Sequence, residues 1–329
     1  MSNLVLSSTR FLVENPRYVF INNEKLEEYA SKLAERELEI PSWDKPFLLG
    51  GKSKEVIDFF FLGNSINFSF KHINDVGVKR SFETEYRGEP YRGAMAMWAC
   101  LKRALEGDFP ELLEGDFLRD ISKPEMENIF QGKNSIPMLE ERLAIFQEVG
   151  AVLYKKYDGR FHNLVEESNH RLFNNGKGLV EKLVFEFPSF NDSAMHEGKL
   201  VVFNKKAQLV PMMLYGRFRN QGDFVVDDID KLTILADYHI PRQLRDSGVL
   251  VYEKSLAERI DNQVEIPKHS REELEIRAST IHVGEKVKNK LNEIKGNNAV
   301  NACHIDYSFF SGPKITGGSE HHLTRTIDY

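Results

Sequence analysis

The sequence is poor in the features that mark secreted and membrane-embedded proteins. Only two cysteines occur among 329 residues, Cys100 and Cys303, so we expect no disulfide framework and read both as free thiols of a reducing compartment. No run approaches the roughly 18 apolar residues of a membrane helix. The first residues lack the basic stretch and apolar core of a secretory signal. We therefore expect a cytoplasmic protein, with the nucleus as the alternative.

An excess of basic residues is also missing. The chain has 44 Lys and Arg against 50 Asp and Glu, which gives a formal net charge of −6. Proteins that bind a long polynucleotide draw most of their non-specific affinity from phosphate neutralisation by a basic surface. The acidic balance disfavours such a partner, and no membrane partner is expected. A small phosphorylated ligand needs only a local cluster of basic side chains and remains compatible with this charge.

Strand patterns, internal repeats and flexible linkers are scarce, whereas apolar residues recur at helical spacing along most of the chain. The best strand candidate is residues 57–70, where the apolar residues of the second half alternate with polar ones. We expect helices over residues 25–37, 91–106, 136–157, 161–172, 178–187 and 200–214. A capping box at Ser270 and Glu273 opens another long helix. The pattern predicts one mainly α domain over residues 1–329, with a small β element near the N-terminus.

A first candidate for a functional residue is Asp237, in the stretch "LADYHIPRQL". Apolar residues at 229, 232, 235 and 236 form a helical face that ends at this aspartate. Pro241 favours the start of a new helix and pushes Ile240 out of helical geometry. Asp237 would then lie in the last turn of a helix, where the dipole disfavours a carboxylate. It is either a solvated turn residue or a carboxylate directed into a pocket.

Two other segments combine aromatic rings with polar groups. In "FEFPSFND", the ring of Phe190 could stack on a purine-like base while Asp192 accepts hydrogen bonds from a guanine-type edge. In "NSINFSFKH", Phe68 or Phe70 could supply a second ring, with polar contacts from neighbours such as His72. The alternative is that the first segment is an ordinary loop after a helix and the second an ordinary alternating strand.

No metal or cofactor motif is complete. "GGKS" lacks the first glycine of a phosphate-binding loop. The pair His321 and His322 has no acidic or cysteine partner at zinc spacing, and adjacent side chains rarely ligate one metal together. We expect no metal and no organic cofactor, and interpret the histidine pair as a contact to an anionic group.

These segments together resemble one family, the queuosine salvage family of queuosine 5′-phosphate N-glycosylase/hydrolases. The resemblance covers most of the chain and rests on the order and spacing of seven stretches, "INFSF", "ACLKRALEGDFP", "FPSFND", "KKAQL", "LTILADYHIPRQLRDSGVLVY", "ELEIRAST" and "HHLTRTIDY". It implies a helical core similar to that of helix-hairpin-helix DNA glycosylases. It also implies hydrolysis of the N-glycosidic bond of queuosine 5′-monophosphate, which releases the base queuine for tRNA modification.

The resemblance also implies roles for individual residues. Asp237 would be the catalytic carboxylate and Tyr238 would lie beside the base. The expected base contacts are Phe190 and Asp192, with Phe68, Phe70 and His72 lining the same pocket. The 5′-phosphate requires basic partners, for which our candidates are Lys206, His321 and Arg325.

Four positions depart from the family pattern. Lys71 stands where tryptophan is usual, His239 and Lys206 where arginine is usual, and Asp328 where an aromatic residue is usual. The departures at 71 and 239 leave open a second hypothesis, a non-catalytic binder of a modified nucleoside or base. A third hypothesis is a DNA base-excision glycosylase, suggested by the implied fold and disfavoured by the net charge.

Overall fold

The computed structural model describes residues 3–71, 80–312 and 318–329, and His72 lies outside these ranges. The described chain is mainly helical, as expected. Its first helices are α1 (Leu4–Glu14), α2 (Asn23–Ala34), α3 (Lys54–Ser65), α4 (Ala94–Glu106), α5 (Gly115–Asp120), α6 (Lys123–Ile129) and α7 (Leu139–Lys156). The later ones are α8 (Phe161–Glu167), α9 (Leu179–Glu186), α10 (Lys205–Phe218), α11 (His239–Asp246), α12 (Lys254–Asp261), α13 (Arg271–Lys295) and α14 (Ala302–Phe310).

The strands form three separate two-stranded antiparallel sheets in the described ranges. Their pairs are β1 (Val19–Ile21) with β6 (Leu250–Tyr252), β2 (Glu83–Tyr86) with β3 (Glu89–Arg92), and β4 (Ser193–His196) with β5 (Lys199–Val202). A small β element near the N-terminus is present as β1, outside the expected residues 57–70, and its partner strand comes from much later in the chain. The other two sheets are local hairpins.

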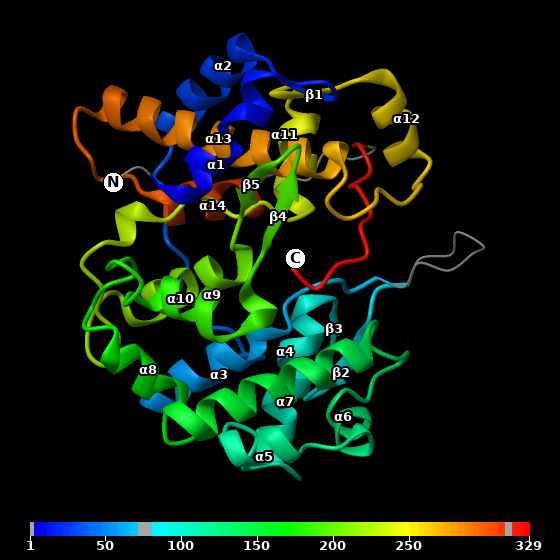
Figure 1. Ribbon diagram of the computed structural model, residues 1–329, viewed down its shortest axis with the longest axis vertical. Coiled ribbons are helices and arrows are strands. Elements are labelled where there is room, and N and C mark those ends of the chain that lie inside the picture. Colours follow the sequence, from blue (N-terminus) through cyan, green and yellow to red (C-terminus); the bar gives the residue numbers. More distant parts are fainter. Residues whose placement is uncertain (1–2, 72–79, 313–317) are drawn as a thin grey trace.

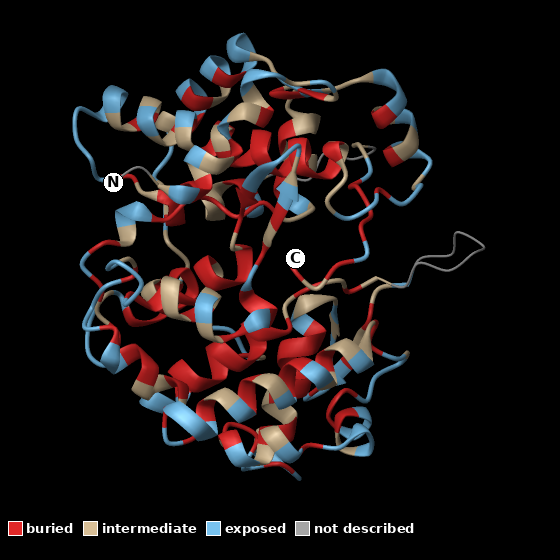
Figure 2. Ribbon diagram, in the orientation of Figure 1, coloured by how far each residue is buried: buried red, intermediate tan, exposed pale blue. Residues whose placement is uncertain are grey.

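The elements form two groups around the middle of the molecule (Figure 1). One group holds α1, α2 and α11 to α14, and the other holds α3 to α10. The last described segment, residues 318–329, runs from the first group and ends between the two. A single hydrophobic cluster includes residues of both groups, from Leu26 in α2 to Phe61 in α3 and Ile276 in α13. Figure 2 shows buried residues concentrated where the helices face each other.

The strand expected over residues 57–70 is wrong. Residues 54–65 form α3, in which every residue from Val56 to Ser65 is buried. A helix that is apolar on all sides has no amphipathic stripe, so periodicity cannot distinguish it from a buried strand. Gly63 allows the close packing, because a Cβ there would lie 2.0 Å from a ring carbon of Trp98 in α4. Residues 67–70 form neither helix nor strand, and Ser69 has a φ of 39°.

Most of the expected helices are present, with boundaries shifted by a few residues. The larger errors lie at 91–106, where β3 precedes α4, and at 200–214, where β5 precedes α10. The capping box at Ser270 is only half formed. Ser270 Oγ accepts from Glu273 N at 3.3 Å, but the Glu273 carboxylate accepts instead from the backbone of His269 and from Tyr329. None of the described helices is both long and apolar enough to cross a membrane.

Candidate functional site

Asp237 lies at the beginning of α11 rather than at the end of a helix. Its Oδ1 accepts hydrogen bonds from the backbone N–H groups of His239 and Ile240, at 2.7 and 3.1 Å. Ile240, expected outside the helix because it precedes Pro241, therefore lies in the first turn. A carboxylate at this end of a helix is favoured by the dipole, which corrects the expectation of an unfavourable helix end. Among the described residues, no hydrogen bond is formed by the other oxygen of Asp237.

The segment before Asp237 is extended, although its apolar spacing predicted a helix. After one 3-10 turn, residues 232–236 are buried without helical hydrogen bonds of their own. Side chains from distant elements bind its backbone instead. Asp306 of α14 accepts from Leu235 N at 2.8 Å, and Arg277 Nε of α13 donates to the carbonyl of residue 236 at 3.3 Å. The approach to Asp237 is thus fixed from two helices.

Asp192 is held in a buried ion pair with Arg277. Arg277 Nη1 donates to Asp192 Oδ1 at 2.9 Å, and Nη2 donates to Oδ2. The guanidinium lies between the rings of Phe203 and Tyr329, 3.9 and 4.5 Å from their centroids. Although burial opposes its charge, Asp192 and Glu273 raise the pKa of Arg277 above its usual value. Asp192 therefore stays paired in this structure.

The two aromatic base-contact candidates, Phe190 and Phe68, are both fully buried. Lys206 Nζ lies 5.1 Å from the ring centroid of Phe68 and 5.4 Å from that of Phe190, so both rings lie beside this lysine. The ammonium donates to Ser65 O at 2.8 Å, and burial lowers its pKa to about 7. Neither ring offers an accessible face to a ligand in this conformation.

A buried arginine holds the segment that carries Phe68 and Phe70. Arg142 of α7 donates to the carbonyls of Ile66, Phe68 and Ser69, the last two at 2.6 and 3.0 Å. Its Cζ lies 4.3 Å from the Phe68 ring centroid and 5.1 Å from that of Phe70. One guanidinium from a neighbouring helix therefore binds three carbonyls of this segment.

The charge of Asp237 acts on two further ionisable groups. Lys205 is buried and donates from Nζ to Asn67 O at 3.3 Å, and burial lowers its pKa although Asp237 and Asp306 oppose the shift. Burial raises the pKa of Asp306 to about 7, and the charge of Asp237 adds to that rise. A lysine and a second carboxyl group thus share the electrostatic surroundings of the candidate catalytic carboxylate.

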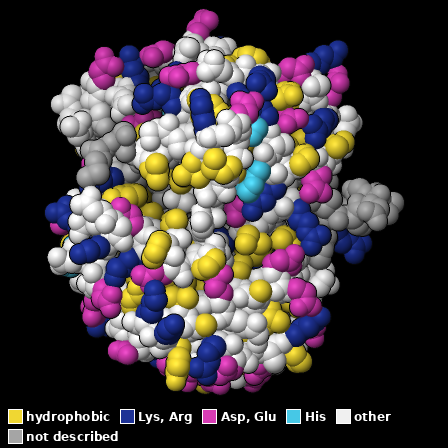
Figure 3. All heavy atoms as spheres, viewed as in Figure 1, with side chains coloured by type: hydrophobic (Ala, Val, Ile, Leu, Met, Phe, Trp, Pro, Cys, Tyr) yellow, Lys and Arg dark blue, Asp and Glu magenta, His cyan; other side chains and the backbone are white. Residues whose placement is uncertain are grey.

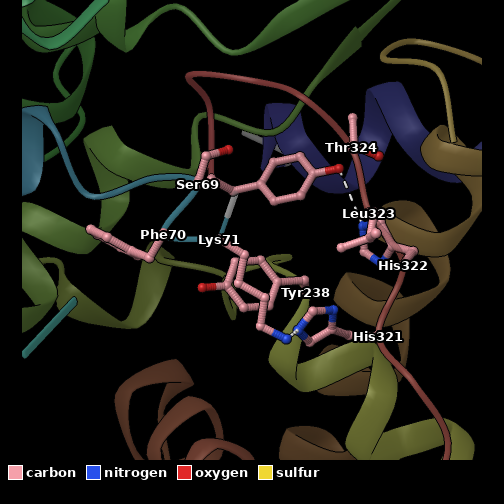
Figure 4. Close-up of a pocket in the computed structure, with 9 residues that line it drawn as sticks. Ser69, Phe70, Lys71, Tyr238, His321, His322, Leu323 and Thr324 are labelled. Atoms are coloured by element: carbon pink, nitrogen blue, oxygen red, sulfur yellow. Dashed lines mark hydrogen bonds between the residues drawn. The ribbon is translucent and has the colours of Figure 1, made fainter. Parts of the chain in front are cut away.

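Tyr238, the residue after Asp237, forms a wall of a narrow cavity of about 40 Å³ (Figure 4). The other walls come from residues 69–71, residues 321–324 and Tyr329. Lys71 Nζ lies 2.6 Å from His321 Nε2, and the ring centroids of Tyr238 and His321 are 4.9 Å apart. The cavity thus brings together Phe70, Tyr238 and His321 from the sequence candidates.

A second hydrogen-bonded group closes the cavity from the side of α13. The hydroxyl of Tyr329 donates to Glu273 Oε1 at 3.0 Å and lies 3.2 Å from His322 Nε2. A main-chain oxygen of Tyr329 accepts from Ser69 N at 3.2 Å, and Ser69 Oγ donates to Thr326 O at 2.9 Å. Burial lowers the pKa of His322 to about 4, so its ring is neutral at physiological pH. Residues 321–329 therefore connect α13 to the segment that carries Phe70.

The three phosphate candidates have separate surroundings. His321 lines the cavity, and Lys206 is buried against Ser65. Arg325 is largely exposed and forms an ion pair with Glu141 at 3.1 Å. The described residues contain no group of three or more His, Cys, Asp or Glu side chains that could hold a metal ion.

The sequence did not single out several residues that build this site. Arg277 lies within "ELEIRAST", Lys205 begins "KKAQL", and Tyr329 ends the tail, so the family resemblance covers these residues without giving them roles. Glu273 was expected only as part of a capping box. Arg142 and Asp306 gave no signal, because an isolated charged residue in a helical pattern is read as surface. The carbonyl of Phe68 that Arg142 binds and the N–H of Leu235 that Asp306 binds lie 74 and 71 residues away in the chain.

Comparisons with known proteins identify the family of this chain. The sequence pattern of the queuosine salvage protein family matches residues 49–329. A protein of Sphaerobacter thermophilus named queuosine 5′-phosphate N-glycosylase/hydrolase is 33% identical over 99% of this chain and 97% of its own length. Proteins of the same name from Mus musculus and Dictyostelium discoideum are 29% and 36% identical, over 98% and 70% of this chain and 97% and 69% of their own lengths.

Proposed function

The chain belongs to the queuosine salvage protein family, and we propose that it hydrolyses the N-glycosidic bond of queuosine 5′-phosphate with Asp237 as the catalytic carboxylate. The observation that carries the assignment is the asymmetry of that carboxylate. One oxygen is anchored by two backbone N–H groups, and the other forms no hydrogen bond to the described residues. Such a group is held in position and still has an oxygen to offer a substrate.

Cleavage of a ribosyl C–N bond builds positive charge on C1′ and the ring oxygen. The free oxygen of Asp237 would stabilise that charge, or bond briefly to C1′ as a nucleophile. The electron pair of the broken bond goes to the base nitrogen, which takes up a proton, and water supplies the hydroxyl group on C1′. Preorganised electrostatic groups of this kind each contribute about 2.7–4 kcal/mol to lowering the barrier. The remainder must come from positioning the base and the sugar phosphate.

We propose that the base lies beside Tyr238 and Phe70, with Phe190, Asp192, Phe68 and His72 as further contacts. The proposal requires the site to widen. The cavity of about 40 Å³ is far below the roughly 300 Å³ of an ordinary ligand pocket, and two of the proposed rings are fully buried. Residues 321–329 form part of the wall, so their displacement from Ser69 is the simplest route to an open site.

The remaining partners follow from the chemistry of the reaction. Basic groups for the 5′-phosphate are proposed among His321, Lys206 and Arg325, and no cofactor is required by a hydrolysis of this type. On the face shown in Figure 3, Lys and Arg alternate with Asp and Glu, which supports a small ligand over a polynucleotide. Two free, buried cysteines suit a reducing compartment such as the cytoplasm.

The direct test is to incubate the purified protein with queuosine 5′-monophosphate and to follow free queuine by chromatography. We expect turnover with the nucleotide and none in a matched sample of the Asp237→Asn variant. Folded wild-type protein that releases no queuine would overturn the proposal. Saturable binding without product in a calorimetric titration would then establish a non-catalytic binder, and binding to duplex DNA at low salt would indicate a DNA glycosylase.

A further inference from the structure

Asp306 of α14 is a second carboxyl group beside the candidate catalytic residue. Its Oδ1 accepts from Leu235 N at 2.8 Å, and the carbonyl of the same Leu235 accepts from Asp237 N at 3.2 Å. Both aspartates are therefore joined by hydrogen bonds to one residue of the segment before α11. The charge of Asp237 acts on Asp306, and the charges of both act on Lys205 of α10. The three ionisable groups thus belong to one site.

Asp306 and Asp237 are anchored in the same way. One oxygen of each carboxyl group accepts from the backbone, and the other oxygen forms no hydrogen bond to the residues that the structure describes. Lys205 is a cation that faces Asp306, but its ammonium donates to Asn67 O at 3.3 Å. Asp306 is only partly buried. Its side chain is therefore fixed in position and keeps one oxygen for a substrate atom or a water molecule.

Hydrolysis of a C–N bond needs a proton acceptor as well as a carboxylate for the sugar. Whether Asp237 stabilises the charge on C1′ or bonds to that carbon, one water molecule must finally add to it. The water must lose a proton as its oxygen bonds to C1′. An aspartate that is bonded to C1′ cannot take this proton, and one that takes it loses the negative charge that stabilises C1′. A second carboxylate removes the conflict.

We propose that Asp306 is the general base that takes this proton from the attacking water molecule. The inference rests on the proposed function and adds a second carboxylate to its machinery. As the water oxygen bonds to C1′, the proton passes to the free oxygen of Asp306, and the electron pair of the bond that breaks at C1′ goes to the leaving atom. The base nitrogen takes up one proton from solvent and Asp306 returns one proton to solvent, so the overall reaction consumes one water molecule.

The surroundings of Asp306 suit a base at physiological pH. Burial raises the pKa of its carboxyl group to about 7 and the charge of Asp237 adds to the rise, while the N–H of Leu235 and the charge of Lys205 oppose it. On α14 itself, burial raises the pKa of the Cys303 thiol, which is therefore neutral. A general base is most effective when its pKa lies near the working pH. The ionised form is the active one, so activity should be lost as the pH falls through about 7.

The test compares the pH dependence of kcat in the wild type and in Asp306→Asn, with queuosine 5′-monophosphate as substrate. The variant keeps an oxygen for Leu235 N. We expect its kcat to fall about 100-fold or more near neutral pH, as is typical for loss of a general base, with KM changed by less than about threefold. The decline of the wild type below about pH 7 should disappear. Asp306→Glu restores a carboxylate and should recover part of the activity together with the decline.

Stability separates a general base from a residue that only holds the backbone. As the pH rises towards 8, Asp306→Asn should gain stability relative to the wild type in chemical denaturation, because the folded wild type must then carry a buried negative charge. The control is Asp230→Asn, at an exposed position in the 3-10 turn of residues 229–231, which should keep the activity of the wild type. Should Asp306→Asn fail to fold, Asp306→Ser takes its place in both measurements.

The outcomes distinguish this inference from the proposed function. An Asp306→Asn variant that keeps the kcat of the wild type, or that shows the same decline of activity below pH 7, overturns the general base while the wild type still releases queuine. Loss of kcat together with loss of stability at pH 8 would show that Asp306 acts only by holding Leu235, and would overturn the inference as well. Wild-type protein without turnover would overturn the proposed function itself.

Discussion

Arg277 and Asp192 form a bidentate ion pair in the interior, with side chains that are 0% and 2% exposed. The pair joins α13 to the loop that follows α9. Through Nε, the same guanidinium binds the carbonyl of Ala236, directly before the candidate catalytic residue Asp237. One arginine thus fixes both a candidate base contact and the approach to the catalytic carboxylate.

Loss of the arginine should destabilise the fold strongly. In Arg277→Met, the carboxylates of Asp192 and Glu273 remain buried without their cation, and breaking a buried pair costs about 3–5 kcal/mol. The double variant Arg277→Met with Asp192→Asn should lose clearly less than the sum of the two single variants, because it leaves fewer uncompensated charges. Chemical denaturation of the four proteins gives the coupling free energy. Strictly additive losses would show that the pair contributes nothing as a pair.

Asp237→Asn should separate catalysis from stability. Asparagine keeps the Oδ1 that accepts from His239 and Ile240, and it caps helices as well as aspartate does, so the free energy of unfolding should change by less than about 0.5 kcal/mol. Asp237→Ala loses the cap and should cost about 1 kcal/mol. Turnover should fall at least about 100-fold in both, since neither has the negative charge. Substantial turnover in Asp237→Asn would remove this residue from the catalytic role.

The sequence predicted the helices that have one apolar face and failed where burial is complete. α2, α7 and α9 were expected within a few residues of their observed bounds, because each keeps a polar face. α3 and residues 232–236 are buried on all sides, and a short apolar run of that kind fits a helix or an extended segment equally well. Residues 232–236 are not helical because Arg277 and Asp306, which lie far along the chain, bind their backbone.

The candidate site was predicted as a set of residues rather than as a network. Asp237 was singled out by the apolar run before it and Pro241 after it, Tyr238 by the family resemblance, and His321 as a basic residue for the phosphate. The structure brings Tyr238 and His321 together. The side chains that hold these residues in place could not be predicted from the sequence. Arg142 and Arg277 are buried cations whose role depends on carbonyls and carboxylates that only the fold brings close. Their charge alone would have placed them at the surface.

Asp306 should give the protein a measurable pH dependence of stability. Burial raises the pKa of its carboxyl group from 3.8 to about 7, so the folded chain retains a proton that the unfolded chain has released. The resulting stabilisation is complete below about pH 4 and is lost as the pH rises through about 7. In Asp306→Asn this contribution is absent. The free energy of unfolding of the wild type minus that of the variant should therefore fall between pH 4 and pH 8.

Measuring the difference between the two proteins isolates Asp306 from other buried groups, such as His322 and Lys206, whose pKa values are also shifted. The variant keeps an oxygen that can accept from Leu235 N, so the backbone contact is retained. The matched control is Asp230→Asn, at an exposed position in the 3-10 turn of residues 229–231. A difference that does not change with pH for Asp306→Asn would mean that its carboxyl group titrates as it does in water.

Tyr329→Phe should show what one hydroxyl group contributes to closing the site. The change removes the donor to Glu273 and the partner of His322, and leaves the aromatic ring against Arg277. Because two buried polar groups then lose a partner, the free energy of unfolding should fall by about 1–3 kcal/mol in chemical denaturation. Tyr307→Phe is the control, since the hydroxyl of Tyr307 forms no hydrogen bond to the residues that the structure describes. Equal effects of the two substitutions would show that water satisfies Glu273 and His322, and that the tail is not fastened there.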